Sequence, residues 1–198
     1  MGKLVAITGV DGCGKTTQIQ RLVEVLNNMG IACGRAKLAD IPNPPESIIK
    51  EMASRYSLDF CGASNRLTFE CLCMKYKIDT FIAQRKLVYS YLLLDRYLES
   101  IFGIAREYKD GGKIVRMLFA DTIMPDVAIL LDVDLGTAYD RMKRRDSIST
   151  NPVTPHQTLA IMNNYFKNEF NFYKLNIVNG EGEVDTVTER LLYEILRN

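Results

Sequence analysis

A glycine-rich stretch near the amino terminus, Gly9–Thr16, carries the residues most plainly suited to chemistry. It reads Gly-Val-Asp-Gly-Cys-Gly-Lys-Thr and fits the pattern G-x-x-x-x-G-K-[ST]. Glycines let the backbone turn so that consecutive N–H groups point inward, and such a ring of donors binds phosphate oxygens. Lys15 can supply an ammonium to the β- and γ-phosphates, and Thr16 can offer a hydroxyl to Mg²⁺. The stretch therefore predicts a nucleoside triphosphate site, with a glycine turn beside a surface lysine as the simpler alternative.

A carboxylate and a guanidinium follow a second apolar run. Leu92-Leu93-Leu94 leads directly into Asp95 and Arg96. A buried parallel strand that ends in these groups places both at the sheet edge where ligands bind. Asp95 can hold Mg²⁺ or its water, and Arg96 can bind a phosphate through two parallel hydrogen bonds. The alternative is a helix-capping aspartate beside a surface arginine.

Four cations are clustered after the apolar run Val127–Val133: Arg141, Lys143, Arg144 and Arg145. Arg141 and Arg145 are four residues apart and therefore share one face of a helix. We expect them to belong to a lid, at about residues 141–155, that closes over the phosphates being transferred. The alternative is a solvated helix end that complements the helix dipole.

Short apolar runs alternate with longer amphipathic stretches along the chain. Strands are expected at Leu4–Thr8, Ile31–Leu38, Leu87–Leu94, Val127–Val133 and Leu175–Val178. Helices are expected at Lys15–Met29, from Glu46, and at Asn65–Gln84, Tyr97–Tyr108, Leu135–Arg145, His156–Lys174 and Val184–Leu196, with a break at Asp110-Gly111-Gly112. The alternation predicts an α/β fold, a doubly wound five-stranded parallel sheet flanked by helices, in a single domain over residues 1–198.

The composition excludes several classes of function. The 198 residues include 25 Lys+Arg against 24 Asp+Glu, so no global basic field exists to hold nucleic acid as a partner. No apolar stretch reaches 18 residues, so no membrane partner is expected. The five cysteines include no C-x-x-C pair, and the amino terminus does not resemble a signal peptide. We expect a cytoplasmic protein with reduced thiols.

Taken together, these motifs resemble the thymidylate kinase family of nucleoside monophosphate kinases over nearly the whole chain. The matching residues are Gly9–Thr17 with Gln18, Asp95-Arg96-Tyr97 with Ser100, Pro125–Val133, and Arg141 with Arg145. The resemblance implies phosphorylation of a nucleoside 5′-monophosphate, most commonly dTMP, by ATP with Mg²⁺. It also implies a homodimer, for which the apolar region Leu118–Ile123 could provide a contact.

The resemblance assigns roles residue by residue. The implied catalytic residues are Lys15, Asp95, Arg96, Arg141 and Arg145, and the implied metal ligands are Thr16 and Asp95. ATP would bind Gly9, Asp11, Gly12, Cys13, Gly14, Lys15, Thr16, Thr17, Arg141, Asn179 and Gly180. The acceptor would bind Asp11, Arg66, Phe69, Arg96, Tyr97 and Ser100. Asp11 would accept a hydrogen bond from the sugar 3′-hydroxyl, and Tyr97 would pack on the sugar.

The chain departs from the family pattern at several positions. Cys13 stands where many members carry an arginine in the phosphate loop, and residues 40–45 contain no arginine to bind the acceptor phosphate. The base-reading arginine expected four residues after Phe69 is Cys73, which leaves Arg66 as the candidate, and the base-reading glutamine is Ala105. Three hypotheses follow: a dTMP kinase; a kinase of another nucleotide, a nucleoside or a specialised small molecule; and a catalytically weak nucleotide-binding module.

Overall fold

The computed structural model describes residues 2–58, 65–146 and 154–197 of the chain. Its centre is a sheet of five parallel strands in the order β2-β3-β1-β4-β5. The strands are β1 (Lys3–Thr8), β2 (Cys33–Ala36), β3 (Tyr91–Asp95), β4 (Val127–Asp132) and β5 (Asn176–Asn179). The predicted α/β fold with a five-stranded parallel sheet is confirmed.

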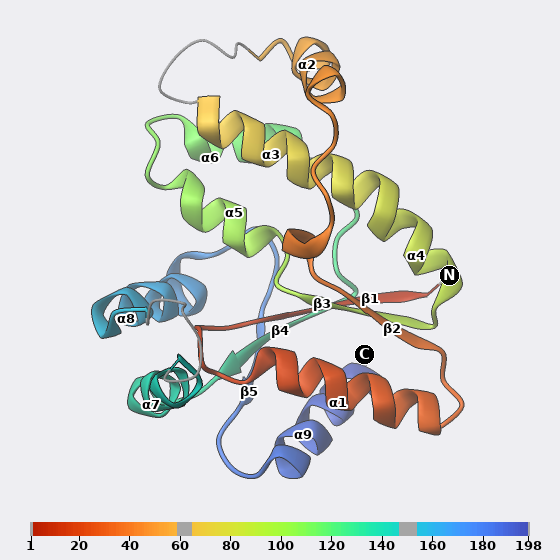
Figure 1. Cartoon of the computed structure of the whole chain (residues 1–198), viewed down its shortest axis with the longest axis vertical. Coiled ribbons are helices and arrows are strands. Elements are labelled where there is room, and N and C mark those ends of the chain that lie inside the picture. The colour runs from red at the N-terminus through yellow and green to blue at the C-terminus, as the bar shows by residue number, and fades with distance from the viewer. Residues whose placement is uncertain (1, 59–64, 147–153, 198) are drawn as a thin grey trace.

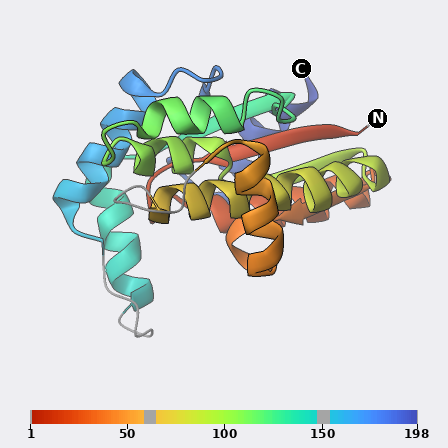
Figure 2. The same cartoon turned by 90° about the horizontal axis from the view of Figure 1, so that it is seen from above.

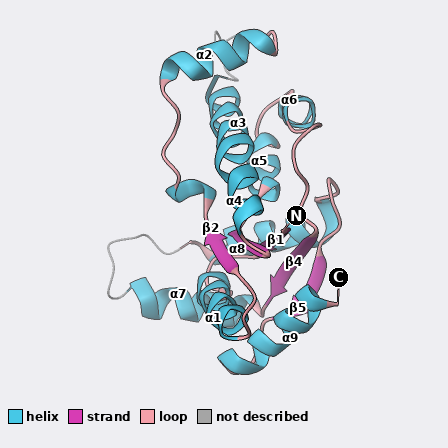
Figure 3. Cartoon of the chain, turned by 90° about the vertical axis from the view of Figure 1, so that its right-hand side faces the viewer, coloured by secondary structure: helices cyan, strands magenta, loops and turns pink. Residues whose placement is uncertain are grey.

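Helices cover both faces of this sheet (Figure 1, Figure 3). One face carries α1 (Lys15–Asn28) and α9 (Val184–Leu196). The other face carries α3 (Asn65–Lys77), α4 (Ala83–Val88), α5 (Leu98–Ala105) and α6 (Gly111–Leu118), with α2 (Glu46–Arg55) beyond α3. The remaining helices, α7 (Leu135–Asp146) and α8 (His156–Asn164), lie on the side toward which the arrowhead of β4 points.

The strands bury side chains on both faces, which explains their continuous apolar sequences. In β1, Leu4 and Ala6 belong to the core under α3, α5 and α6, whereas Val5 and Ile7 belong to the core under α1 and α9. All four are at most 2% exposed. Because a fully buried leucine or isoleucine contributes about 2 kcal/mol, this alternation fixes the strand between both layers.

The order of the strands places the site. The chain adds β2 and β3 on one side of β1 and then β4 and β5 on the other, so the connections reverse direction at β1. Ligands of open α/β sheets bind beyond the carboxyl ends of the strands at such a switch point. Residues 9–14 follow β1 at this point, and Ile7 pairs with Asp95 at the end of β3.

Two elements differ from the sequence-based expectation because an apolar run does not distinguish strand from helix. The strand expected at Leu87–Leu94 begins only at Tyr91, and Leu87 and Val88 end α4 with side chains 72% and 71% exposed. The helix expected at His156–Lys174 ends at Glu169 after a π-helical segment, Tyr165–Glu169. Phe170 turns out of the helix and packs edge-on against Phe102 of α5 at 5.9 Å.

A further helix, α6, was not expected from the glycines at its start. Gly111 opens α6, and a Cβ there would lie 2.1 Å from the carbonyl oxygen of Ala105, so this tight approach requires glycine. The same helix buries Leu118, and Phe119 follows it at 0% exposure. Leu118 and Phe119 belong to the chain's own core, and the expected dimer contact at Leu118–Ile123 stays a prediction. Among the described residues, no helix is long and apolar enough to cross a membrane.

Two helices extend past the body of the sheet on the same side, as Figure 2 shows for α2 and α7. The carboxyl end of α7 carries Arg141 and Arg145 out over the end of β1. The predicted lid at about residues 141–155 begins in this helix, and its residues 147–153 lie outside the described part of the chain.

Candidate active site

The loop Gly9–Gly14 forms a cradle whose backbone conformation requires glycine at three positions. Gly9, Gly12 and Gly14 have φ values of 150°, 81° and 99°, in the range that other residues rarely adopt. A Cβ on Gly12 would lie 2.1 Å from the carbonyl oxygen of Ala138, so α7 packs directly against the loop. The backbone amides that follow lead into the first turn of α1, where a helix amino terminus favours anions.

Lys15 lies inside this cradle. Its Nζ donates to the carbonyl oxygens of Gly9 and Val10 at 2.9 and 2.8 Å and lies 3.7 Å from the Cys13 sulfur. The side chain is 7% exposed, and burial lowers the pKa of Lys15 although Cys13 and Asp11 favour its charged form. An ammonium held this way is positioned for phosphate oxygens in the loop.

A hydroxyl and a carboxylate meet beside the cradle. Thr16 Oγ1 donates to Asp95 Oδ2 at 2.8 Å, which joins the first turn of α1 to the end of β3. Mg²⁺ takes oxygen ligands and commonly binds through one or two protein oxygens together with water and substrate phosphates. The Thr16 hydroxyl and the Asp95 carboxylate are oxygen ligands of this kind and would fit such a site. Among the described residues, no group of three or more His, Cys, Asp or Glu side chains could hold a metal ion.

Arg96 follows β3 in a strained conformation and points back at the loop. Its φ is 67°, in the left-handed region, and such strain is typical of functional positions. Its backbone N–H donates to the Ile7 carbonyl at 3.0 Å, and its guanidinium forms an ion pair with Asp11 at 2.6 Å. Burial opposes the charge of Asp11, but Arg96 and Lys15 outweigh burial and hold the pKa of Asp11 below its ordinary value.

Asp11 also contacts the far end of the predicted lid. Thr154 Oγ1 donates to Asp11 Oδ2 at 3.2 Å. On the other side of the lid, Arg141 donates from Nη1 to the Cys13 carbonyl at 3.4 Å. The two ends of the predicted lid therefore both touch the phosphate loop.

A cavity of about 550 Å³ joins these groups. It is lined by Asp11, Gly12, Gly14, Lys15, Thr16, Thr17, Lys37, Asp95, Arg96, Arg141, Met142 and Arg145. The structure thus brings all five predicted catalytic residues to one cavity. Its walls are cationic on the α7 side and on the Arg96 side, which suits a polyphosphate.

A second cavity, of about 610 Å³, lies between α5 and α8. It shares only Asp11 and Arg96 with the first. Its other walls are Glu99, Ser100, Gly103, Ile104, Arg106, Glu107, Thr158, Ile161, Met162, Tyr165 and Phe166. Ser100 Oγ is buried with no hydrogen-bond partner among the described residues, so it is available to a ligand.

A third, smaller cavity of about 170 Å³ lies on the opposite side of the loop. It is bounded by Cys13, Gly14, Thr17, Gln18, Arg141, Gly180, Gly182, Val184 and Val187. Gly180 donates from its N–H to the Asp132 carbonyl at 2.7 Å, which fixes this turn to β4. Asn179 is not among the described residues that line the cavity, although its Oδ1 accepts from the Glu181 N–H at 2.8 Å and so shapes the turn.

Three predicted acceptor residues are not brought to these cavities. Tyr97 is fully buried and donates its hydroxyl to the Ile123 carbonyl at 2.6 Å, so its expected contact with a sugar is wrong. Phe69 is half-buried and packs on the core, and Arg66 is exposed on α3. Neither is among the described residues that line the two larger cavities.

The structure adds lining residues that the sequence did not single out. Lys37 follows β2 and enters the first cavity, and Thr158 and Ile161 of α8 enter the second. No sequence motif marks these residues. Each one reaches the site only through the way its strand or helix packs in the fold.

The fold and the site together define a P-loop phosphotransferase. A profile of the family described as thymidylate kinase matches residues 7–191, and the chain belongs to this family. It is therefore an enzyme of the nucleoside monophosphate kinase type.

Individual relatives resemble the chain along most of its length. A probable thymidylate kinase of Pyrococcus abyssi is 26% identical over 96% of this chain and 94% of its own length. The thymidylate kinase of Pelobacter propionicus is 23% identical over 100% and 95%. The thymidylate kinase of a Thermoanaerobacter species is 31% identical over 73% and 70%.

Proposed function

We propose that the chain transfers the γ-phosphate of ATP to a nucleoside 5′-monophosphate, with dTMP as the first candidate acceptor. The observation that carries this proposal is the pair of large cavities that meet only at Asp11 and Arg96. One cavity contains the phosphate cradle, and the other is lined by both apolar and polar side chains, which a nucleoside could use for its base and its sugar. The junction is where two phosphates would meet. The thymidylate kinase names of the relatives favour dTMP.

The chemistry requires positioning and charge stabilisation more than covalent participation by the protein. An oxygen of the acceptor phosphate attacks the γ-phosphorus, the bond between that phosphorus and the β,γ-bridging oxygen breaks, and ADP leaves. Lys15 and the loop amides hold the donor phosphates, Arg96 holds the acceptor phosphate, and Arg141 and Arg145 neutralise charge on the transferred group. Mg²⁺ held by Thr16 and Asp95 would supply further charge neutralisation at the donor phosphates.

Asp11 holds two groups in the proposed reaction. Its carboxylate pairs with Arg96 at 2.6 Å and faces the second cavity, where a sugar 3′-hydroxyl could donate to it. When the acceptor phosphate binds Arg96, the carboxylate is released to the sugar. Thr154 contacts Asp11 as well, so we propose that the lid, residues 141–155 of a single kinase domain, responds to acceptor binding.

A broader choice of acceptor is supported by a specific observation. The two positions where the family pattern would place base-reading groups carry Ala105 and Cys73, which are 1% and 3% exposed and lie in the core. Polar side chains at the rim of the second cavity, such as Arg106 and Glu107, are the remaining candidates to read a base. Since unpaired polar groups are what reject wrong substrates, we expect relaxed discrimination between bases.

Initial rates of ADP release across a panel of acceptors test the proposal. The panel contains dTMP, dUMP, dCMP, dGMP, dAMP, their ribonucleotide forms and thymidine. We expect turnover of monophosphates, with dTMP fastest. Thymidine should show little turnover because it lacks the phosphate that Arg96 would bind. A faster rate with another monophosphate would reassign the acceptor but retain the mechanism. ATP binding without turnover of any monophosphate would contradict it and favour a binding module.

A further inference from the structure

Glu99 is a buried carboxylate at the start of α5. The residue is 0% exposed and lies three positions after Arg96, in the first turn of the helix. Removing a carboxylate from water is costly unless hydrogen-bond donors surround it. Two such donors are present and both are neutral, since no lysine or arginine in the described part of the chain pairs with Glu99. The identity of these donors indicates what the carboxylate holds in place.

One carboxylate oxygen holds the peptide group that follows Arg96. Glu99 Oε1 accepts from the Tyr97 N–H at 2.7 Å. Because a peptide group is planar, this bond also fixes the carbonyl of Arg96 and with it the ψ angle of that residue. On the other side, the Arg96 N–H donates to the Ile7 carbonyl at 3.0 Å. The backbone of Arg96 is therefore held at both of its peptide bonds.

These two anchors hold Arg96 in a conformation that residues other than glycine rarely adopt. Its φ of 67° lies in the left-handed region, which persists in a residue with a side chain only where the surrounding structure imposes it. In this conformation the guanidinium pairs with Asp11, at the junction of the two large cavities. An Arg96 that relaxed to a negative φ would direct its guanidinium away from this junction.

The second carboxylate oxygen joins Glu99 to the segment that precedes β5. Glu99 Oε2 accepts from the hydroxyl of Tyr173. Burial and the Glu99 carboxylate raise the pKa of Tyr173, so the hydroxyl keeps the proton that it donates. The Glu99 carbonyl accepts from the Tyr165 hydroxyl at 3.1 Å. Two tyrosines thus fix Glu99 in the orientation in which it meets the Tyr97 N–H.

We propose that Glu99 is a positioning residue for the acceptor's phosphate and acts on it through Arg96. With support from Tyr173, it keeps the Arg96 backbone in the left-handed conformation and directs the guanidinium to the place where the two phosphates meet. This inference rests on the proposed function and deepens it by assigning the group that prepares Arg96 before a monophosphate binds. A guanidinium held in advance loses less conformational freedom on binding. No bond to Glu99 forms or breaks during transfer.

The test compares binding of dTMP with binding of thymidine, which lacks only the phosphate that Arg96 would bind. Glu99→Met retains the length of the side chain, and so the wall of the second cavity, but cannot accept from Tyr97. We expect it to weaken binding of dTMP about 10-fold or more and to leave binding of thymidine unchanged. Glu99→Gln retains an acceptor oxygen and should recover most of the affinity. Glu189→Met, at an exposed glutamate of α9, is the matched control.

A second background separates an effect through Arg96 from direct contact with the ligand. In Arg96→Met, Glu99→Met should cause no further loss of dTMP affinity, because residues that act through one another have non-additive effects. Tyr173→Phe removes only the supporting donor, so it should weaken binding of dTMP about 2- to 10-fold and have no effect in Arg96→Met. Circular dichroism checks that each variant folds, and Tyr173→Phe decides the question if Glu99→Met does not.

Equal weakening of dTMP and thymidine binding by Glu99→Met would indicate a general loss of structure and overturn the inference, as would unchanged binding of both. A further loss of dTMP affinity in the Arg96→Met background would also overturn it. In each case, continued phosphorylation of a monophosphate by the wild type would leave the proposed function standing. If the acceptor panel selects another monophosphate, that nucleotide and its nucleoside replace dTMP and thymidine. Absence of any monophosphate turnover by the wild type would overturn the proposed function and this inference together.

Discussion

Asp11 holds the guanidinium of Arg96 at 2.6 Å and lies at the one junction between the donor and acceptor cavities. If this carboxylate accepts from the sugar 3′-hydroxyl, Asp11→Ala should remove discrimination between dTMP and its 3′-deoxy analogue. We expect the ratio of their kcat/KM values to fall about 10-fold or more, since a hydrogen bond to a charged group is worth about 1.5–3 kcal/mol. Asp11→Asn, which retains an acceptor oxygen, should give an intermediate ratio; an unchanged ratio in Asp11→Ala would contradict the assignment.

The pH dependence of this preference has a predicted sign. Arg96 and Lys15 outweigh burial and lower the pKa of Asp11, so the carboxylate stays charged at and below the ordinary carboxyl pKa of about 4. The preference for the 3′-hydroxyl should therefore be constant from neutral pH to about pH 5 and be lost only as the pH falls through the lowered pKa. An Asp11-dependent decline centred near pH 6 in the kcat/KM profile would contradict this.

Sequence reasoning succeeds at the residue scale where a site is contiguous. The phosphate loop and its lysine form one short motif whose backbone fixes its own geometry, so their roles could be predicted. Tyr97 was predicted wrongly because the direction of its side chain depends on how α5 packs, and it points into the core. Lys37 was missed because no motif marks it, and it lines the first cavity only because it follows the last paired residue of β2, Ala36.

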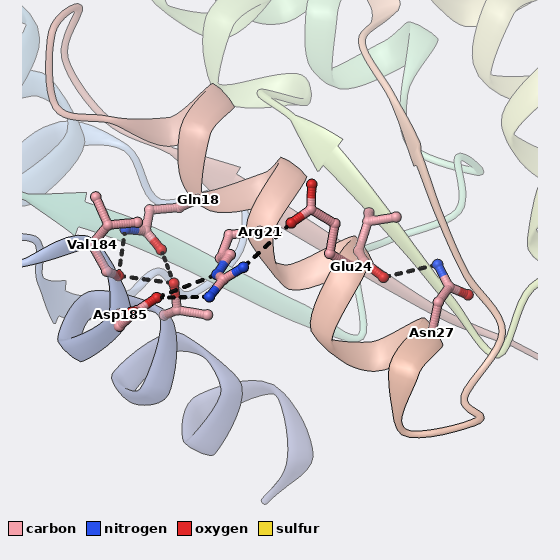
Figure 4. A network of polar contacts seen from close by, with 8 residues as sticks. Gln18, Arg21, Glu24, Asn27, Val184 and Asp185 are labelled. Carbon is pink, nitrogen blue, oxygen red and sulfur yellow. Dashed lines mark hydrogen bonds and ion pairs between the residues drawn. The ribbon is translucent and has the colours of Figure 1, made fainter.

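At the scale of elements, α1 and α9 are joined by a polar network that supports the small cavity beside the loop (Figure 4). Gln18 Nε2 donates to the Val184 carbonyl at 3.1 Å, and Thr188 Oγ1 donates to Gln18 Oε1 at 2.8 Å. Arg21 pairs with Asp185 at 3.1 Å on the surface, a contact worth less because both side chains are exposed. The buried Gln18 therefore ties the amino end of α9 to the phosphate-loop helix.

Thr188→Val tests this connection without changing the size of the side chain. Loss of the hydroxyl leaves the Gln18 oxygen without its donor, so the free energy of unfolding should fall by about 1–2 kcal/mol. KM for ATP should rise while the acceptor KM stays the same, because the cavity by Gly180 and Val184 adjoins the donor side. Urea unfolding measures the free energy of unfolding, and steady-state kinetics measure the two KM values. Thr186→Val, at an exposed position of the same helix, is the control; equal effects of the two variants would contradict the role of Gln18.

The type and order of the long elements could be predicted, whereas their ends could not. Alternating strands and helices identified the parallel sheet because both of its faces are buried. The end of α4 is as apolar as a strand, with Leu87 and Val88 exposed at its close, so periodicity misplaced the boundary. In the sequence, Gly111 predicts the end of a helix. In the structure it begins α6, where its backbone lies close to the Ala105 carbonyl.

At the scale of the whole molecule, the two ends of the sheet have different tasks. The carboxyl end carries the site, and the amino end carries a cluster of polar contacts centred on Asp126, which is itself partly exposed. Asp126 Oδ2 accepts from the Leu4 N–H and from Lys86 Nζ, both at 2.7 Å, and joins β1, α4 and the start of β4. Lys86 is 5% exposed, and its ammonium forms an ion pair with Asp126 at 2.7 Å.

Asp126→Asn should therefore destabilise the fold without altering catalysis. An unpaired buried ammonium predicts a loss of about 1–3 kcal/mol in the free energy of unfolding, the lower end being set by the partial exposure of Asp126. Burial opposes the charge of Asp126, but the Leu4 N–H and Lys86 outweigh burial and lower its pKa. The stabilisation should be complete above pH 4 and decline as the pH falls through the lowered pKa. Unfolding curves measure the loss of stability, and kcat at 25 °C measures catalysis. A fall in kcat for the folded Asp126→Asn variant would contradict the prediction that this cluster acts on stability alone.

We propose that the phosphate cradle holds ATP while its γ-phosphoryl group is transferred to a monophosphate held at Arg96. The direct measurement is a single-turnover reaction with γ-labelled ATP and dTMP, followed by separation of the products. We expect the label to appear in dTDP, Lys15→Ala to lower this rate about 10²- to 10³-fold, and the variant to retain its circular dichroism spectrum. Label found in inorganic phosphate alone, or undiminished transfer by folded Lys15→Ala, would contradict it.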